Sequence, residues 1–292
     1  MTTVGIVTGA GRGMGLACAQ RLTDQVDRLL LVDRDEATVT AAAKDLSATG
    51  RGAVVEPFVL DITDAEGLAG LAARVGELGT LRAVAHAAGI SPTMADWRRI
   101  FTVDLVGTAL LARTLRPLAT EGTALVCFAS MAPLLGGTDP DPAVDAVLDD
   151  PLDERFLDRV HEAVGPGIED TGIAYAWAKR GVHRFVQREA VRIGPLGARV
   201  CSVSPGLIDT PQGRQESASH PGMELLLRQT PLGLSRGGPR TSPRPSPSCC
   251  RPRRVSSAGS TFSWTAVCAP PSGHEPTASE FVRAHMRPRE CP

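Results

Sequence analysis

The sequence predicts an α/β fold with one doubly wound parallel sheet, and three observations lead to that prediction. Short apolar runs that fit buried parallel strands alternate with longer segments of helical periodicity. A glycine-rich loop at residues 8–15 (TGAGRGMG) joins the first apolar run to the first helical segment. The chain of 292 residues can bury a full core, in one large α/β domain or two small ones.

Composition excludes several classes of partner. The formal net charge of −1 argues against a nucleic-acid or polyanion partner. The first residues lack the basic-then-apolar layout of a signal peptide, and no apolar run approaches membrane-spanning length. The seven cysteines show neither a disulfide framework nor the spacing of a metal site. We therefore expect a soluble, cytoplasmic protein with no metal and with no membrane or nucleic-acid partner.

Six apolar runs are predicted as strands, at residues 4–7, 29–32, 54–60, 81–85, 125–129 and 199–203. Helical periodicity marks residues 16–22, 97–118 and 174–193. Residues 131–174 change character, with turn-rich stretches at residues 138–143 and 149–153. Within this segment, residues 153–164 are predicted to form an acidic amphipathic helix.

The first strand, the glycine loop and the first helix form a phosphate-binding layout. Glycines let the backbone approach a pyrophosphate, and the helix N-terminus offers free N–H groups and the positive end of a dipole. Asp33 ends the second strand, where a carboxylate accepts hydrogen bonds from a ribose diol and repels a 2′-phosphate. This favours NAD over NADP, although the adjacent Arg34 weakens the preference.

Polar or small residues follow the later strands as well. Asp61 and Ile62 come after the third strand, where the carboxylate can meet an adenine amino group. Residues 86–89 (HAAG) follow the fourth, and their small side chains let the backbone pass close beneath a cofactor. We interpret His86 itself as a structural hydrogen-bonding residue rather than a catalyst. Ser130 follows the fifth strand, at the edge where doubly wound sheets bind ligands.

Tyr175 and Lys179 are four residues apart, so they lie one turn apart on the same helix face. An ammonium close to a phenol stabilises the phenolate and lowers the tyrosine pKa from its ordinary value of about 10. Tyr175 is the only tyrosine in the chain, and Lys179 is one of two lysines, the other being Lys44. The pair predicts a general acid/base that exchanges a proton with an alcohol or carbonyl oxygen.

Taken in order, these motifs resemble the classical short-chain dehydrogenase/reductase family from about residue 4 to residue 232. The likeness rests on the glycine loop, Asp33, Asp61, residues 87–89 (AAG), Ser130, Tyr175-x-x-x-Lys179 and Pro205-Gly206. It implies a single Rossmann-like domain over residues 1–233 and relatives that are commonly dimers or tetramers.

The resemblance also implies roles for individual residues. Tyr175 would be the acid/base, Ser130 would orient and polarise the substrate oxygen, and Lys179 would hold the nicotinamide ribose and depress the tyrosine pKa. Thr210 would meet the carboxamide. The implied cofactor-binding residues are Gly9, Arg12, Gly13, Met14, Gly15, Asp33, Asp61, Ile62, Ala88, Gly89, Tyr175, Lys179, Pro205, Gly206, Ile208 and Thr210.

Asp104 joins Ser130, Tyr175 and Lys179 in the implied catalytic set, but the family usually has asparagine there. That asparagine is thought to support a water that links the lysine to solvent, partly through its backbone carbonyl. Aspartate keeps the backbone and the size, so it is compatible with that relay, although its charge departs from the pattern.

The 44 residues between Ser130 and Tyr175 replace the dozen or so typical of the family. An insertion here resembles that of the bacterial 3α-hydroxysteroid dehydrogenase/carbonyl reductases. One interpretation is a surface excursion that alters only assembly, and the other is a lid that shapes a pocket for a bulky alcohol or ketone.

Residues 234–292 also depart from the family, which has a helix and a last strand ending in Val-Asp-Gly-Gly. This tail holds ten prolines, nine arginines and no aspartate, a composition that predicts disorder. Read one nucleotide over, GC-rich codons for residues 257–267 give approximately Val-Ser-Gly-Val-Asp-Leu-Leu-Val-Asp-Gly-Gly. We interpret the tail as the product of a frameshift near residues 232–238, and a native disordered tail is the alternative.

Two functions follow from these features. The first is an NAD(H)-dependent oxidoreductase that interconverts a secondary alcohol and a ketone, with a steroid-like, alicyclic or small carbonyl substrate. The second is a nucleotide-binding protein of the same family without turnover, which Asp104 and the aberrant tail favour.

Overall fold

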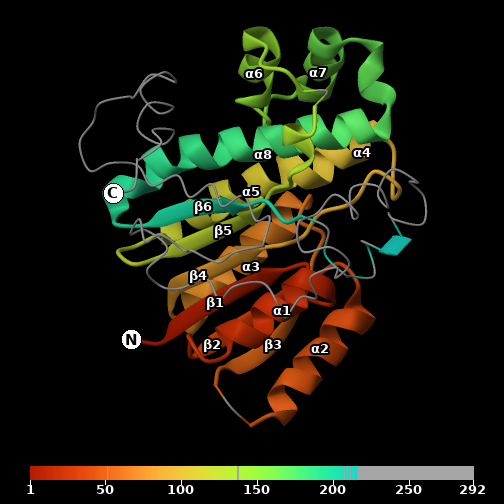
Figure 1. Ribbon diagram of the computed structural model, residues 1–292. Helices are drawn as coiled ribbons and strands as arrows, with labels where there is room; N and C mark the ends of the chain where they lie inside the picture. The colour runs from red at the N-terminus through yellow and green to blue at the C-terminus, as the bar shows by residue number, and fades with distance from the viewer. Residues whose placement is uncertain are drawn as a thin grey trace, which may run out of the picture.

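The computed structural model describes residues 1–50, 52–136, 138–206, 208, 210, 212, 214 and 215. In this part of the chain, six parallel strands form one sheet in the order β3-β2-β1-β4-β5-β6 (Figure 1). The strands are β1 (Thr3–Thr8), β2 (Arg28–Asp33), β3 (Val54–Val59), β4 (Thr80–His86), β5 (Ala124–Phe128) and β6 (Arg199–Val203). The predicted fold class is confirmed, and every predicted strand agrees within one residue at each end.

Helices cover both faces of the sheet because alternate strand residues point to opposite sides. Leu30 and Val32 of β2 pack with α3 (Ala65–Leu78), α5 (Gly107–Leu115) and α8 (Thr171–Ile193). Leu29 and Leu31 pack on the other side with α1 (Gly13–Leu22) and α2 (Glu36–Ala48). The two apolar clusters therefore lie on opposite faces of one sheet, as a doubly wound fold requires (Figure 1).

The strand order reverses at β1, which lies between β2 and β4. In such folds a crevice opens at the carboxyl ends of the strands beside the reversal, and ligands bind there. The glycine loop follows β1, Asp33 ends β2 and Ser130 lies two residues beyond β5. The topology thus brings the sequence motifs to one edge of the sheet.

The segment predicted as helical over residues 97–118 is helical throughout, but its geometry changes along its length. It comprises α4 (Trp97–Phe101), the π-helical turn η1 (Thr102–Val106), α5 and the 3-10 turn η2 (Arg116–Leu118). The Gly107 N–H bonds to the carbonyl of Thr102, five residues back. π-turns are rare and often occur at functional sites, and this one contains the buried Asp104.

The inserted segment contains α6 (Pro142–Leu148), α7 (Phe156–Val164) and the 3-10 turn η4 (Pro166–Glu169). The turn predicted at residues 138–143 is wrong from Pro142 on, because Asp141 caps the helix through the Ala143 and Val144 N–H groups and Pro142 occupies a first-turn position. The turn predicted at residues 149–153 is present. The predicted acidic helix is present but begins at residue 156. Asp153 instead accepts from the Arg155 N–H in a turn that precedes it.

The insertion helices are held against the outer surface of α8 and α4 (Figure 1). Arg180 donates two hydrogen bonds of 2.9 Å to Asp145, and Arg184 donates two of 2.8 Å to Asp149. On the α4 side, Phe101 meets the Phe156 ring edge-on at 5.9 Å. The two-bond pairs between these arginines and aspartates fix the orientation of the insertion helices as well as their distance from α8.

We expect residues 137–167 to serve packing and assembly rather than substrate choice, because Asp145 and Asp149 of this segment are paired with arginines of α8. Deleting them should therefore leave the ranking of alcohol substrates by kcat/KM unchanged. A changed ranking would favour the lid interpretation. The deletion also exposes the α8 face, so oligomeric state should be measured alongside by light scattering.

In the described part of the chain, no helix is long and apolar enough to cross a membrane. β6 forms one edge of the described sheet. The predicted tail at residues 234–292, the frameshift and the domain end at residue 233 lie outside the described residues.

Candidate active site

The loop after β1 has a backbone that only glycine fits. Gly9 and Gly13 adopt positive φ angles of 65° and 60°. A Cβ on Gly15 would lie 1.9 Å from the Gly9 carbonyl oxygen, far inside contact distance. Arg12 precedes α1 and its side chain makes no capping hydrogen bond. The first N–H groups of α1 are thus presented to an anion, which is the geometry of a pyrophosphate site.

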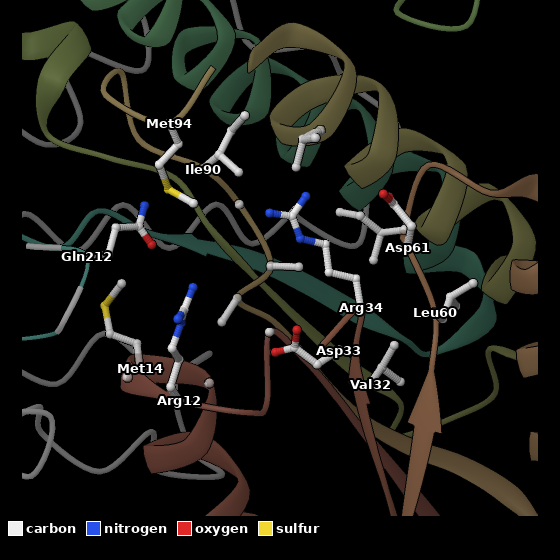
Figure 2. A pocket seen from close by; sticks show the side chains of 18 of the residues that line it. Arg12, Met14, Val32, Asp33, Arg34, Leu60, Asp61, Ile90, Met94 and Gln212 are labelled. Atoms are coloured by element: carbon white, nitrogen blue, oxygen red, sulfur yellow. The ribbon is translucent and has the colours of Figure 1, made fainter. Parts of the chain in front are cut away.

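A pocket opens beside this loop, and most of the predicted cofactor-binding residues line it (Figure 2). They are Gly9, Arg12, Gly13, Met14, Gly15, Asp33, Asp61, Ile62, Ala88, Gly89 and Thr210. Pro205, Gly206 and Ile208 follow β6 and do not line this pocket, and neither do Ser130, Tyr175 and Lys179.

Sequence reasoning missed Arg99, which lines the pocket together with Met94 and Gln212. Met94 and Arg99 lie just before and within α4, and Gln212 lies beyond β6. Arg99 belongs to no motif and ends no strand, so no pattern in the chain indicated it.

At the β2 end, the pocket is lined by one carboxylate and two arginines. Asp33 accepts from the Gly11 N–H at 3.0 Å and from the Asp35 N–H at 3.2 Å. Figure 2 shows Arg12 to the left of Asp33 and the Arg34 guanidinium above it, and all three residues line the pocket. The backbone bonds orient the Asp33 carboxylate, while the arginines add positive charge at the same end.

At the β3 end, Asp61 is held by several donors. Its oxygens accept from the Thr63 N–H and hydroxyl at 2.9 and 2.8 Å and from Arg99 at 2.6 Å. Burial alone would raise the pKa of Asp61, but these hydrogen bonds outweigh it and hold that pKa below its ordinary value. An adenine amino group would therefore share this carboxylate with Arg99.

The predicted acid/base pair lies on α8 where that helix passes the end of β5. Lys179 is 5% exposed, and its Nζ lies 5.5 Å from the centroid of the Tyr175 ring and donates to the Phe128 carbonyl at 3.2 Å. Two residues after Phe128, the Ser130 hydroxyl accepts from the Ala132 N–H at 3.1 Å, which leaves its own hydrogen to be donated. Ser130, Tyr175 and Lys179 are thus brought to the same strand end from segments far apart in sequence.

His183 is a further residue of this group that sequence reasoning missed. Its Nε2 lies 3.2 Å from the Ser130 carbonyl and 3.2 Å from the Ser204 hydroxyl, so it joins the ends of β5 and β6. Burial, with the charges of Lys179 and Arg180, lowers its pKa against the opposing bond to Ser130, which keeps the ring neutral near pH 7.

Asp104 faces Lys179 directly. It is 1% exposed, its Oδ1 accepts from the Ile90 N–H at 2.8 Å, and its Oδ2 lies 3.5 Å from Lys179 Nζ. A Cβ on Gly89 would lie 3.0 Å from Asp104 Oδ1 and 3.3 Å from Lys179 Nζ, so a side chain there would crowd both groups. The backbone carbonyl of Asp104 accepts from the Thr108 hydroxyl at 2.7 Å.

His86 bonds to two hydroxyls inside the core. Nδ1 lies 2.7 Å from Thr8 Oγ1, and Nε2 lies 2.9 Å from Thr108 Oγ1. Thr108 donates its hydrogen to Asp104, so it accepts from His86, and Thr8 accepts from the Ala88 N–H and donates to the ring. Burial, with the charge of Lys179, lowers the His86 pKa to about 3. The ring is neutral and links β1 to α5.

Comparison with known proteins identifies the family. The family model described as enoyl-(acyl carrier protein) reductase matches residues 9–143. Trans-4-hydroxycyclohexanecarboxylate dehydrogenase from Sinomonas cyclohexanicum is 30% identical over 243 residues, which is 79% of this chain and 79% of the relative. The chain is a classical short-chain dehydrogenase/reductase. The predicted family, an oxidoreductase family with a nucleotide-binding fold, is confirmed.

Other members of the family agree with this assignment. Galactitol 2-dehydrogenase (L-tagatose-forming) from Cereibacter sphaeroides is 27% identical over 236 residues, covering 78% of this chain and 80% of that protein. The structure of actinorhodin polyketide ketoreductase with NADPH superposes with a TM-score of 0.59 at 19% identity, covering 81% of this chain and 85% of that one. At this identity the structural likeness shows the fold alone.

The described residues contain no group of three or more histidine, cysteine or acidic side chains that could hold a metal ion. The titratable groups of the site are therefore the phenol, the ammonium, the carboxylates and the two neutral histidines.

Proposed function

We propose that this dehydrogenase/reductase interconverts a secondary alcohol and a ketone with NAD(H). The observation that carries the proposal is the grouping of Ser130, Tyr175 and Lys179 at the end of β5, on the same sheet edge as the pocket beside the glycine loop. The glycine loop fits a pyrophosphate closely, since a single added Cβ at Gly15 would collide with the loop itself. The residues present therefore fit a nicotinamide dinucleotide.

The residues would divide the work as follows. The glycine loop and the α1 N-terminus would hold the pyrophosphate, Asp33 the adenosine ribose, and Thr210, beside Gly13, the carboxamide. When bound, the nicotinamide supplies or takes up the hydride. Tyr175 would give a proton to the substrate oxygen or take one from it, and Ser130 would donate a hydrogen bond that polarises that oxygen. Lys179 would stabilise the phenolate through its positive charge.

We infer an alicyclic secondary alcohol as the first substrate class to test. The 30% identical relative is named for a hydroxylated cyclohexane ring, and the galactitol dehydrogenase is named for an open-chain polyol. Both names describe oxidation at a secondary carbinol carbon. Steroid-like alcohols belong to the same class by their ring hydroxyls and form the second part of the panel.

NAD rather than NADP is the proposed cofactor, and Asp33 is the residue on which that choice depends. Replacing Asp33 with serine removes the carboxylate and leaves the two flanking arginines free to meet a 2′-phosphate. We expect Asp33→Ser to shift the ratio of NADPH to NADH affinity by at least about tenfold toward NADPH, since an uncompensated charge contact is worth roughly 1.4 kcal/mol or more. Titration of each dinucleotide by calorimetry measures the ratio.

The matched control is Asp45→Ser, which removes an exposed carboxylate of α2 away from the pocket and changes the net charge equally. It should leave the ratio unchanged. A wild-type chain that already prefers NADPH would contradict the NAD assignment and make Arg12 and Arg34 the deciding residues.

The alternative function is a family member that binds a dinucleotide without turnover. Tight NADH binding together with no reaction on any alcohol or ketone of the panel would favour it. The predicted homo-dimer or homo-tetramer and the cytoplasmic location stay predictions.

A further inference from the structure

Two charged groups are buried together beside Tyr175, and they come from different elements. Lys179 belongs to α8, and Asp104 belongs to the π-helical turn η1. Within the described residues, Asp104 Oδ2 has no hydrogen-bond partner, and it lies 3.5 Å from the ammonium of Lys179. An asparagine would present a neutral amide there, whereas an ionised carboxylate places a negative charge next to the cation that serves the tyrosine.

The other titratable groups that face this pair do not supply a compensating charge. His86 on β4 is neutral, and burial raises the pKa of Cys127 on β5, so that residue is a thiol. On α8 itself, His183 is neutral near pH 7, and Arg180 is paired with Asp145 at 2.9 Å. The ammonium of Lys179 is therefore opposed by the Asp104 carboxylate alone among the described groups that touch the pair.

A carboxylate beside Lys179 weakens the stabilisation that the lysine charge gives to the Tyr175 phenolate. A lone ammonium 5.5 Å from the centroid of the phenol ring favours the phenolate in a buried site, because the interaction is poorly screened there. A carboxylate next to the cation turns it into an ion pair, and the field of an ion pair falls off much faster than that of a single charge. Burial raises the pKa of Asp104 against the attraction of Lys179, and Asp104 and Tyr175 raise the pKa of Lys179 against its burial.

We infer that Asp104 is a positioning residue that sets the working pH of the site: its carboxylate cancels much of the field of Lys179 at Tyr175, so the phenol keeps its proton to higher pH. This inference rests on the proposed function for its catalytic meaning. With a protonated tyrosine at neutral pH, proton donation to a ketone proceeds readily. Alcohol oxidation needs the phenolate, so its rate should keep rising into the alkaline range.

The single tyrosine makes the inference testable without any substrate. Tyr175 is the only tyrosine in the chain, so the ultraviolet absorbance of tyrosinate reports this phenol alone. Titration of the full chain, with Tyr175→Phe as the blank, gives its apparent pKa directly. We expect Asp104→Asn to lower that pKa by about one unit or more. An unchanged or higher value in Asp104→Asn would overturn the inference.

Glu189→Gln is the matched control, because Glu189 is also a buried carboxylate of an ion pair, with Arg116 at 2.8 Å. It lies on α8 about 21 Å along the helix axis from Tyr175, at about 1.5 Å per residue. It should leave the tyrosinate titration unchanged. An equal shift in both variants would mean that loss of any buried carboxylate perturbs the phenol, which would also overturn the inference.

A second variant and a kinetic measurement distinguish failure of this inference from failure of the proposed function. Asp104→Ser places a smaller neutral residue at the same position and should shift the titration in the same direction if Asp104→Asn does not fold. If the enzyme turns over, the acid limb of kcat/KM for alcohol oxidation should move to lower pH in step with the titration. Absence of turnover would count against the proposed function, while the tyrosinate titration would still decide the role of Asp104.

Discussion

Tyr175→Phe is expected to lower kcat by a factor of about 10² to 10⁴, because it removes the group that exchanges the proton with the substrate oxygen. The change deletes a single hydroxyl, and the ring that packs beside the core and 5.5 Å from Lys179 Nζ is retained. The Kd for NADH should therefore change by no more than a few-fold. Steady-state kinetics in both directions and a calorimetric NADH titration measure the two effects.

The stability of this variant serves as its control. Tm should stay close to the wild-type value, and NADH should raise it by a similar amount in both proteins, since binding to the native state stabilises it by mass action. Turnover within a few-fold of wild type would show that Tyr175 is not the acid/base. The site would then need another proton donor.

Gly15→Ala is expected to have the second large effect, at least a tenfold loss of dinucleotide affinity. Its Cβ would lie 1.9 Å from the Gly9 carbonyl oxygen and 2.5 Å from the Gly9 carbonyl carbon. Backbone atoms cannot move aside as the end of a flexible side chain can, so the loop must change conformation. Its N–H groups would then no longer point at the pyrophosphate. An NADH titration and a thermal melt of the same sample measure binding and stability together.

Gly70→Ala is the matched control for this glycine. Gly70 lies exposed in α3, and a Cβ there meets nothing within 4 Å. Alanine should stabilise that helix by up to about 1 kcal/mol and leave NADH affinity unchanged. NADH affinity close to wild type in Gly15→Ala would show that the loop does not hold the cofactor.

The strand ends of this fold were predictable because each carries its own local signal. The glycine loop, Asp33, Asp61 and Ser130 each follow an apolar run, and parallel strands bring their carboxyl ends to one edge of the sheet. Topology alone therefore assembles these residues. The spacing of Tyr175 and Lys179 depends only on the helical repeat, so it was equally readable.

What the sequence could not reveal depends on contacts between elements. The π-helical turn at η1 has no distinctive composition, yet it contains Asp104, which faces Lys179 of α8. His183 matters only because α8 passes the ends of β5 and β6 at that point. Arg99 reaches Asp61 across 38 positions of sequence. No local periodicity encodes such partners.

The insertion contains a helix-start pattern that was interpreted as a turn. Asp141-Pro142 was interpreted as a turn, but the same pair is a common helix start, with the carboxylate as cap and proline in the first turn. The resulting helix carries the carboxylate that meets Arg180 and Arg184. These arginines on α8 also indicate a helix at this position, but their pairing with Asp145 is evident only from the structure.

The central claim is tested most directly by incubating the full chain with NAD and a panel of alicyclic secondary alcohols at alkaline pH while following NADH absorbance. We predict NADH formation with at least one member of the panel, with NADP a poorer partner than NAD and Tyr175→Phe inactive under the same conditions. NADH binding without turnover on any member, in either direction, would contradict the claim and identify a dinucleotide-binding protein that has lost its reaction.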